Sequence, residues 1–198
     1  MDSERLRRQM DFCREIDKEK FIGRQTYLTN AVRKENDAEH AWHAALMAIL
    51  LSEYANEKID VLKTVLMILI HDIVEIDAGD TYAYDDEGKK TQQYREQAAA
   101  ERLFGILPSE KGKYLYDLWQ EFELCQTPEA KFAHTMDNIQ PLMLNDHTNG
   151  LAWKEHGVHL SQVLKRQKKT AEGSSVLCEY AIDNLIMPNV EKGNLINN

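Results

Sequence analysis

The sequence predicts an all-α protein built as a single domain. Its 198 residues suffice for one sizeable hydrophobic core. Contents of 43% hydrophobic and 29% charged residues are typical of a globular chain. Only 9 Gly and 4 Pro interrupt it, and no segment shows the clear alternation of apolar and polar residues that marks a half-buried strand. Long helices are therefore favoured over a sandwich or a barrel.

Helical spacing of apolar residues begins near the N-terminus. We expect a first helix over residues 3–21, ended by Gly23, and an irregular loop over residues 24–34. Asn36 or Asp37 is a suitable N-cap for a second helix that reaches about residue 54.

The third expected helix is the most apolar segment of the chain. It covers residues 61–75, follows an N-cap at Asp60, and is apolar almost all round, which indicates a buried central element. The polar segment 77–90 carries two glycines and is expected to cross the mouth of a site as a loop.

Capping residues and apolar spacing define the later helices. Pro108 suits a first helical turn, and Thr127-Pro128 reads as an N-cap followed by Pro at the first helical position. The expected ranges are 91–104, 108–124, 128–144, 151–168 and 175–187. We expect a core over residues 24–187 and a frayed tail over residues 188–198.

Charge and cysteine content limit the partners and the compartment. The formal net charge of −9 argues against non-specific binding to nucleic acid, although a local cluster of Arg and metal can still bind a small anion. The three cysteines are scattered, the N-terminus lacks an apolar signal-peptide region, and no apolar stretch is long enough for a bilayer. We expect a cytoplasmic protein with neither nucleic-acid nor membrane partners.

His71-Asp72 lies at the end of the most apolar helix, where a charge is costly unless it is paired or bound to a metal. Consecutive helical residues point about 100° apart, so both bind one ion only if it sits close to the helix surface. The other ligands must come from neighbouring helices, and His40 and Asp137 are the best candidates because each follows an apolar helical pattern. Two imidazoles and two carboxylates suit one divalent ion such as Mn²⁺, Co²⁺, Mg²⁺, Fe²⁺, Ni²⁺ or Zn²⁺.

The order His40, His71-Asp72, Asp137 resembles the H…HD…D signature of the HD-domain superfamily of phosphohydrolases. The segments RKENDAEHAWHAALMA, LIHDIVEIDAGD and AKFAHTMDNIQPL are similar to the blocks of YfbR-type 5′-deoxynucleotidases and of their eukaryotic HD-domain-containing relatives. The resemblance runs from about Arg24 to Leu144. It implies a helical HD-domain fold of about six to eight helices around one metal site, and a homodimer.

The resemblance also implies roles for individual residues. The metal ligands are His40, His71, Asp72 and Asp137; the catalytic carboxylate is Glu75; Asp80 lies near the sugar and the attacking water; and Arg24 binds the phosphate. In the deoxynucleotidases a Trp that helps select the sugar follows this Arg, whereas Gln25 follows it here. Deoxyribose selectivity is therefore less well supported than phosphate chemistry.

The position of Glu75 in the expected helix also supports a catalytic role for its carboxylate. One turn beyond Asp72 on the same helix face, it can reach a metal-bound water or a leaving oxygen. Hydrolysis of a phosphomonoester needs an activated water, neutralised phosphoryl oxygens and a proton for the leaving alkoxide. A metal, Arg24 and a carboxylate can supply these.

Two histidines and four functions compete with this interpretation. His43 is better read as a packing residue than as a rival of His40, and His134 as a surface residue or an outer neighbour of Asp137. A guanosine-tetraphosphate hydrolase typically has a Glu-Asp pair where Glu75 precedes Ile76 here. A triphosphohydrolase is usually longer, an HD-type di-iron oxygenase needs more histidines, and a non-enzymatic nucleotide-binding protein would have lost a ligand or Glu75. The favoured function is a metal-dependent 5′-nucleotidase acting on (deoxy)nucleoside 5′-monophosphates.

Overall fold

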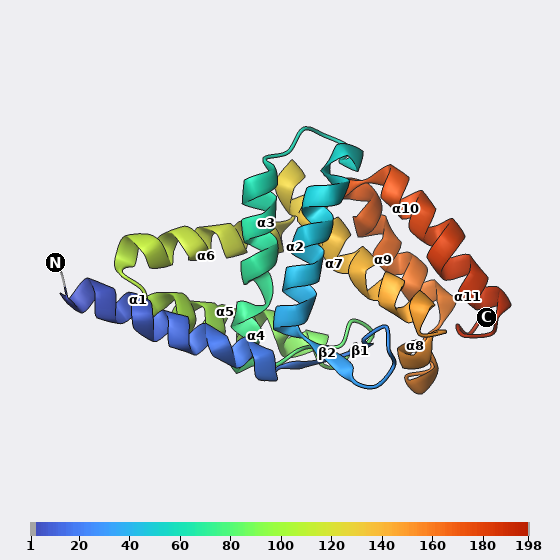
Figure 1. Cartoon of the computed structure of the whole chain (residues 1–198), viewed down its shortest axis with the longest axis horizontal. Helices are drawn as coiled ribbons and strands as arrows, with labels where there is room; N and C mark the ends of the chain where they lie inside the picture. The colour runs from blue at the N-terminus through green and yellow to red at the C-terminus, as the bar shows by residue number, and fades with distance from the viewer. Residues whose placement is uncertain (1–2, 198) are drawn as a thin grey trace.

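The computed structural model describes residues 3–197 and confirms the mainly helical class (Figure 1). The α-helices are α1 (Ser3–Glu15), α2 (Asp37–Leu51), α3 (Val61–Ile70), α4 (Glu75–Ala78), α5 (Lys89–Gly105), α6 (Ser109–Leu124), α7 (Pro128–His147), α8 (Leu151–Glu155), α9 (Leu160–Gly173), α10 (Ser175–Ala181) and α11 (Met187–Glu191). A π-helical turn, Ile182–Ile186, joins α10 to α11.

These segments outnumber the six to eight expected helices because several expected helices are split. The expected helix 61–75 becomes α3, a 3₁₀ turn over His71–Val74 and then α4. The expected helix 151–168 becomes α8 and α9, and Gly157, with φ of 57°, lies at the break between them. Such a left-handed backbone conformation ends a helix and suits glycine.

The segment expected to be an irregular loop forms two short strands instead. Strand β1 (Gly23–Tyr27) pairs antiparallel with β2 (Lys34–Asn36), with Gly23 opposite Asn36 and Tyr27 opposite Lys34. The strands are mostly polar, so they lack the alternation that identifies a strand in a sequence. Tertiary contacts stabilise them: Tyr27 donates a hydrogen bond to Glu155 at the end of α8, and Lys34 forms an ion pair with the same carboxylate at 3.3 Å.

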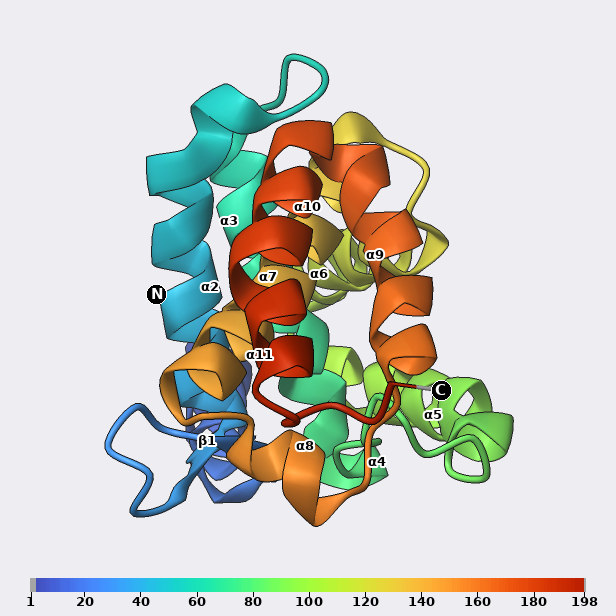
Figure 2. The ribbon, with the colours of Figure 1, turned by 90° about the vertical axis from the view of Figure 1, so that its right-hand side faces the viewer.

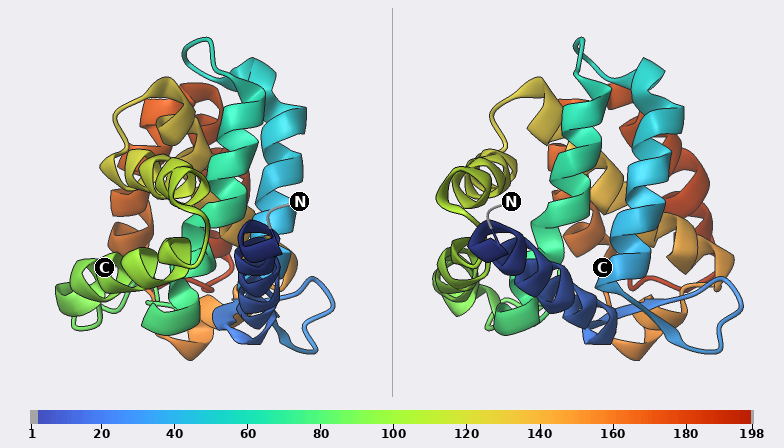
Figure 3. Two further views of the ribbon diagram at one scale, coloured as in Figure 1. Left: turned by 90° about the vertical axis from the view of Figure 1, so that its left-hand side faces the viewer. Right: turned by 60° about the vertical axis from the view of Figure 1, so that its left-hand side comes forward.

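Helices α2 and α3 stand side by side, with α7 behind them (Figures 1 and 3). On one flank α9 packs against α7, and α10 packs against α9; on the other flank α5 packs against α6, and α1 lies beside α5. Figure 2 shows α9, α10 and α11 covering the face opposite α1.

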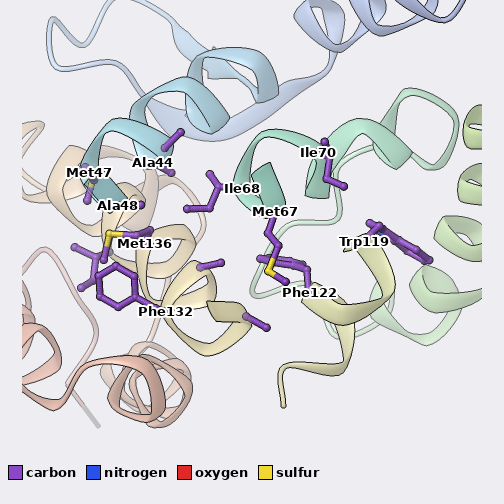
Figure 4. Close-up of a cluster of buried hydrophobic side chains, with 14 of the residues drawn as sticks. Ala44, Met47, Ala48, Met67, Ile68, Ile70, Trp119, Phe122, Phe132 and Met136 are labelled. Atoms are coloured by element: carbon purple, nitrogen blue, oxygen red, sulfur yellow. The ribbon is translucent and has the colours of Figure 1, made fainter. Parts of the chain in front are cut away.

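The hydrophobic core lies where α2, α3, α6 and α7 meet (Figure 4). Met67 and Ile68 of α3 and Phe132 and Met136 of α7 have no exposed surface. Burial of each such side chain contributes about 1.5–3 kcal/mol. Among residues 3–197, no helix combines the length and the apolar character needed to cross a membrane.

Residues 188–197 of the C-terminal segment expected to fray are packed on the domain, and residue 198 lies outside the described residues. Asn189 is fully buried, and Leu195 is 4% exposed. Ile196 donates a backbone hydrogen bond to Val158 and accepts one from Leu160, which ties the segment to the start of α9. The sequence gives little sign of this because most of the stabilising bonds are made by backbone and Asn groups.

Candidate metal and phosphate site

The four expected metal ligands converge at one end of α2 and α3, although they are far apart in the sequence. His40 lies near the start of α2, His71 and Asp72 in the 3₁₀ turn after α3, and Asp137 in the middle of α7. His40 Nε2 lies 3.2 Å from Asp137 Oδ1 and 4.0 Å from Asp72 Oδ2. His71 Nε2 lies 3.1 Å from Asp72 Oδ1 and 3.9 Å from Asp137 Oδ1.

Hydrogen bonds on the far side of each imidazole orient the two rings. His40 Nδ1 lies 2.8 Å from Gln140 Oε1, while the amide nitrogen of Gln140 faces Glu35 and His43. That arrangement makes Gln140 Oε1 the acceptor and His40 Nδ1 the donor. His71 Nδ1 donates to the carbonyl of Ile68 at 2.7 Å. The lone pair of each ring is then on Nε2, which faces the carboxylates, as in metal-bound histidines.

This arrangement suits a metal cation. His71 Nε2 is buried and has no well-directed hydrogen-bond partner. Burial lowers the pKa of His71, but the carboxylates of Asp72 and Asp137 outweigh burial and raise it well above the usual value. The carboxylates thus favour positive charge at Nε2. The Nε2 atom of each imidazole lies within about 4 Å of both carboxylates, an arrangement that matches the preferences of a divalent first-row metal ion.

Arg24 points into the same site from β1. Its Nη1 donates to Asp72 Oδ2 at 2.8 Å and to Asp37 Oδ1 at 3.2 Å, and its side chain is 14% exposed. Asp37 reaches the site because Asn36, and not Asp37, caps α2: the Asn36 side chain accepts from Glu39 N, and the Glu39 side chain accepts from Asn36 N. Of the two N-cap candidates for this helix, Asn36 and Asp37, the structure therefore selects Asn36.

The surroundings of Glu75 favour the protonated form of its carboxyl group. Burial and then the charges of Asp72 and Asp37 raise its pKa well above the usual value. Its carboxyl group is within hydrogen-bond reach of Asp37, and atoms of Asp37, Asp72 and Glu75 lie within 4.8 Å of one another. Burial, followed by the charge of Asp72, also raises the pKa of Asp37 to about 7. A carboxyl group that remains protonated near neutral pH can serve as a general acid.

A cavity of about 880 Å³ is lined by Arg24, His71, Asp72, Glu75 and Asp137, whereas Asp37 and His40 are fully buried beside it. Asp80, which follows α4, faces the same space, and burial raises the pKa of its carboxyl group. Gln25 lines the mouth next to Arg24, where its side-chain oxygen accepts from Lys34 Nζ at 2.8 Å. Six of the seven residues expected at the site thus line one cavity, and the seventh, His40, is fully buried and contacts Asp137.

The two competing histidines lie outside the donor set. His43 is half-buried, and its Nδ1 lies 3.2 Å from the amide nitrogen of Gln140, on the far side of that residue from His40. His134 stacks on Phe122 with ring centroids 4.0 Å apart, and its Nε2 donates to the Phe122 carbonyl. The ring of Phe122 also contacts His71 at 4.7 Å, so His134 is one layer removed from the site.

Sequence reasoning missed two residues of the site. Asp37 was considered only as a cap, although an acid three residues before His40 on the same helix face was a usable signal. Arg166 of α9 lies with its Nη2 3.9 Å from Asp137 Oδ2 and donates to Asn138 Oδ1. No local pattern identifies Arg166, because α9 reaches the site only through its packing on α7.

Comparisons with known proteins agree with this geometry. A family model described as "HD domain" matches residues 16–177. Human 5′-deoxynucleotidase HDDC2 is 28% identical over 135 residues, which cover 68% of this chain and 65% of the human protein. The Xenopus laevis protein of the same name is 29% identical over 135 residues, with coverage of 68% and 66%. The chain therefore matches just under two thirds of the length of these relatives.

Solved structures extend the similarity to nearly the whole chain. A predicted metal-dependent phosphohydrolase from Magnetospirillum magnetotacticum MS-1 is 47% identical, with a TM-score of 0.92 and coverage of 97% of this chain and 96% of that one. A conserved hypothetical protein from Pyrococcus furiosus is 18% identical, with a TM-score of 0.63 and coverage of 92% and 99%, and it shares the fold alone.

Proposed function

The chain belongs to the HD-domain family and is an HD-type metal-dependent phosphohydrolase, and on that premise we propose that it is a 5′-nucleotidase that releases phosphate from (deoxy)nucleoside 5′-monophosphates. One observation carries the proposal: His71, Asp72 and Asp137 of the donor set line the same cavity as Arg24 and Glu75. A single phosphomonoester can contact the metal site, Arg24 and Glu75 at once.

Each group of the chain has a distinct task in this proposal. His40, His71, Asp72 and Asp137 would hold one divalent metal, which supplies an activated water and neutralises phosphoryl oxygens. Arg24 binds the phosphate by charge-assisted hydrogen bonds, and Asp37 orients its guanidinium group. Glu75 donates the proton that its surroundings retain to the leaving 5′-oxygen. Asp80 accepts a hydrogen bond from the 3′-hydroxyl of the sugar.

Aromatic side chains in the same cavity support a nucleoside as the leaving group. Tyr82, Tyr84 and Trp153 line the cavity, and the rings of Tyr82 and His156 pack with centroids 4.6 Å apart and a tilt of 43°. Flat rings suit a nucleobase. Gln25 offers less bulk than a Trp against a 2′-hydroxyl, so we expect ribonucleotides to be cleaved detectably, though less well than deoxyribonucleotides.

The test compares kcat/KM for dAMP, AMP, dATP and guanosine tetraphosphate with one metal at a time: Mg²⁺, Mn²⁺ or Co²⁺. The proposal expects phosphate release from dAMP first and AMP second. Faster turnover of either polyphosphate than of both monophosphates would assign the chain to a polyphosphate hydrolase. Binding without turnover of any of them would make it a nucleotide-binding protein.

A further inference from the structure

Four cationic side chains besides Arg24 line the cavity, and three of them form the group described here. Lys89 begins α5, while Lys165 and Arg166 belong to α9, and Figure 2 shows these two helices on the same side of the molecule. Residues 162, 165, 166 and 169 of α9 all face the cavity, which is the spacing of one helix face. We call Lys89, Lys165 and Arg166 the cationic cluster.

Few carboxylates pair with the cationic cluster, although the chain has a formal net charge of −9. Within residues 3–197, neither Lys89 nor Lys165 has a carboxylate within salt-bridge distance, and Arg166 has only Asp137, at 3.9 Å. Burial lowers the pKa of Lys89, and the positive charges of Arg166 and Lys165 lower it further. Three mutually repelling cations in one cavity create a local demand for an anion.

The cationic cluster is continuous with the metal donor set. Arg166 Nη2 lies 3.9 Å from Asp137 Oδ2, and the charges of Arg166 and Lys165 act on Lys89, which lines the same cavity. Lys169 also faces the cavity, but its charge acts on Glu123, which lines the cavity with Glu96, so we leave Lys169 out of the cluster. Exposed Asp86 and Asp85 offset part of the charge of Lys89, and its Nζ donates a hydrogen bond to the Ala83 carbonyl.

A single phosphate at the metal site would leave most of the positive charge of the cationic cluster without a bound anion. The cavity of 880 Å³ lies towards the upper end of the range for small-molecule sites, roughly 300–1,000 Å³. Two ammonium groups and one guanidinium group match the charge and the multiple acceptor oxygens of a phosphate better than those of a carboxylate.

We propose that the cationic cluster is a subsite for a second phosphate group of the substrate, so that the preferred nucleotide carries one phosphate at the metal site and another at Lys89, Lys165 and Arg166. This inference rests on the proposed nucleotidase function. The second phosphate is either attached to the 3′-oxygen of the sugar or the next phosphate of a 5′-chain, and the experiment distinguishes the two.

The experiment measures dissociation constants by calorimetry for dAMP, dADP and deoxyadenosine 3′,5′-bisphosphate. The protein is the full chain loaded with Mn²⁺ and carrying Glu75→Gln to slow turnover. Lys89→Gln and Lys165→Gln are added separately. The matched control is Lys168→Gln, since Lys168 is exposed on the same helix and does not line the cavity.

We expect at least one of the doubly phosphorylated ligands to bind roughly tenfold more tightly than dAMP, because each charge-assisted contact adds to the affinity. Lys89→Gln and Lys165→Gln should abolish that advantage and leave the affinity for dAMP within about twofold. Lys168→Gln should preserve it. Equal affinity for all three ligands, or an equal loss in the control, would overturn the subsite.

Hydrolysis by the unmodified enzyme separates the two proposals. Tight binding of the 3′,5′-bisphosphate, with release of its 5′-phosphate, supports both proposals. Tight binding and faster hydrolysis of dADP supports the subsite and overturns the monophosphate function. Good hydrolysis of dAMP without any advantage for a second phosphate retains the nucleotidase and overturns the subsite.

Discussion

Replacing Arg24 with methionine removes the positive charge that pairs with Asp72 and Asp37 in the site. Arg24 Nη1 is 2.8 Å from Asp72 Oδ2. At an effective dielectric constant of about 20, opposite unit charges at this separation attract by roughly 6 kcal/mol, and desolvation of the ions offsets part of that energy. Asp37, 3.2 Å from the same nitrogen, would also lose its partner. Breaking a buried ion pair typically costs about 3–5 kcal/mol.

We therefore expect Arg24→Met to lower the free energy of unfolding of the metal-free protein by about 3 kcal/mol, which corresponds to a decrease in Tm of roughly 6–12 °C for a chain of this size. Chemical and thermal denaturation followed by circular dichroism measure both values. A metal bound to Asp72 supplies positive charge to the same carboxylate, so the loss should be smaller in the metal-loaded protein.

Arg33→Met is the control, because Arg33 pairs with Glu39 on the surface and should leave the free energy of unfolding close to that of the unmodified protein. A loss below about 1 kcal/mol for Arg24→Met would refute the reasoning that Arg24 compensates a buried carboxylate cluster. An equal loss with and without metal would refute the idea that Arg24 and the metal neutralise the same carboxylate.

Four other predictions concern metal, proton transfer, pH and assembly. Asp72→Ala should remove bound metal and activity together, measured by elemental analysis and phosphate release; retained metal would exclude Asp72 as a ligand. Glu75→Gln should lower kcat about a hundredfold or more without loss of metal, and near-normal turnover would make Glu75 structural. Burial lowers the pKa of His134 to about 4, so the unfolded chain binds a proton there before the folded one does. The contribution of His134 to the free energy of unfolding should therefore be fully present above pH about 6.5. It should decrease by up to about 1.4 kcal/mol per pH unit as the pH falls towards 4, and His134→Gln should make the free energy of unfolding less dependent on pH in this range. The expected homodimer would bury the exposed apolar face of α2, where Trp42 is 62% exposed, and Trp42→Glu should then produce a monomer by light scattering; an unchanged mass would exclude this face.

Local patterns account for the parts of the fold that were predicted correctly. Asp60 caps α3, and its side chain accepts from Lys63 N; Thr127 caps α7 in the same way, and Pro128 follows at the first helical position. The all-round apolar character of α3 marks it as a central element, and Met67 and Ile68 are fully buried. These features depend on residues within one or two turns of each other, so they can be read from sequence.

The parts of the fold that were predicted wrongly depend on contacts between residues far apart in the sequence. Strand β1 depends on pairing with β2 and on contacts with Glu155, which lies 128 residues beyond Tyr27. The C-terminal segment depends on backbone hydrogen bonds to Val158 and Leu160. Contacts of this kind produce no periodic pattern of apolar residues in the strand or in the C-terminal segment, so they cannot be predicted from the local sequence.

The features of the site also separate into those set by local sequence and those set by contacts between distant segments. By itself, the sequence determined the residue types and the order of the donor set, because chemistry restricts buried His and Asp in apolar helices to a few uses and the ordered blocks resemble one family. Only the tertiary structure decided that Gln140 and the Ile68 carbonyl turn both imidazoles towards the carboxylates, that Asp37 joins Arg24 and Glu75, and that α9 brings Arg166 to the same cavity. The physical reason is that a side chain's type is fixed locally, whereas its direction and its neighbours depend on how distant helices pack.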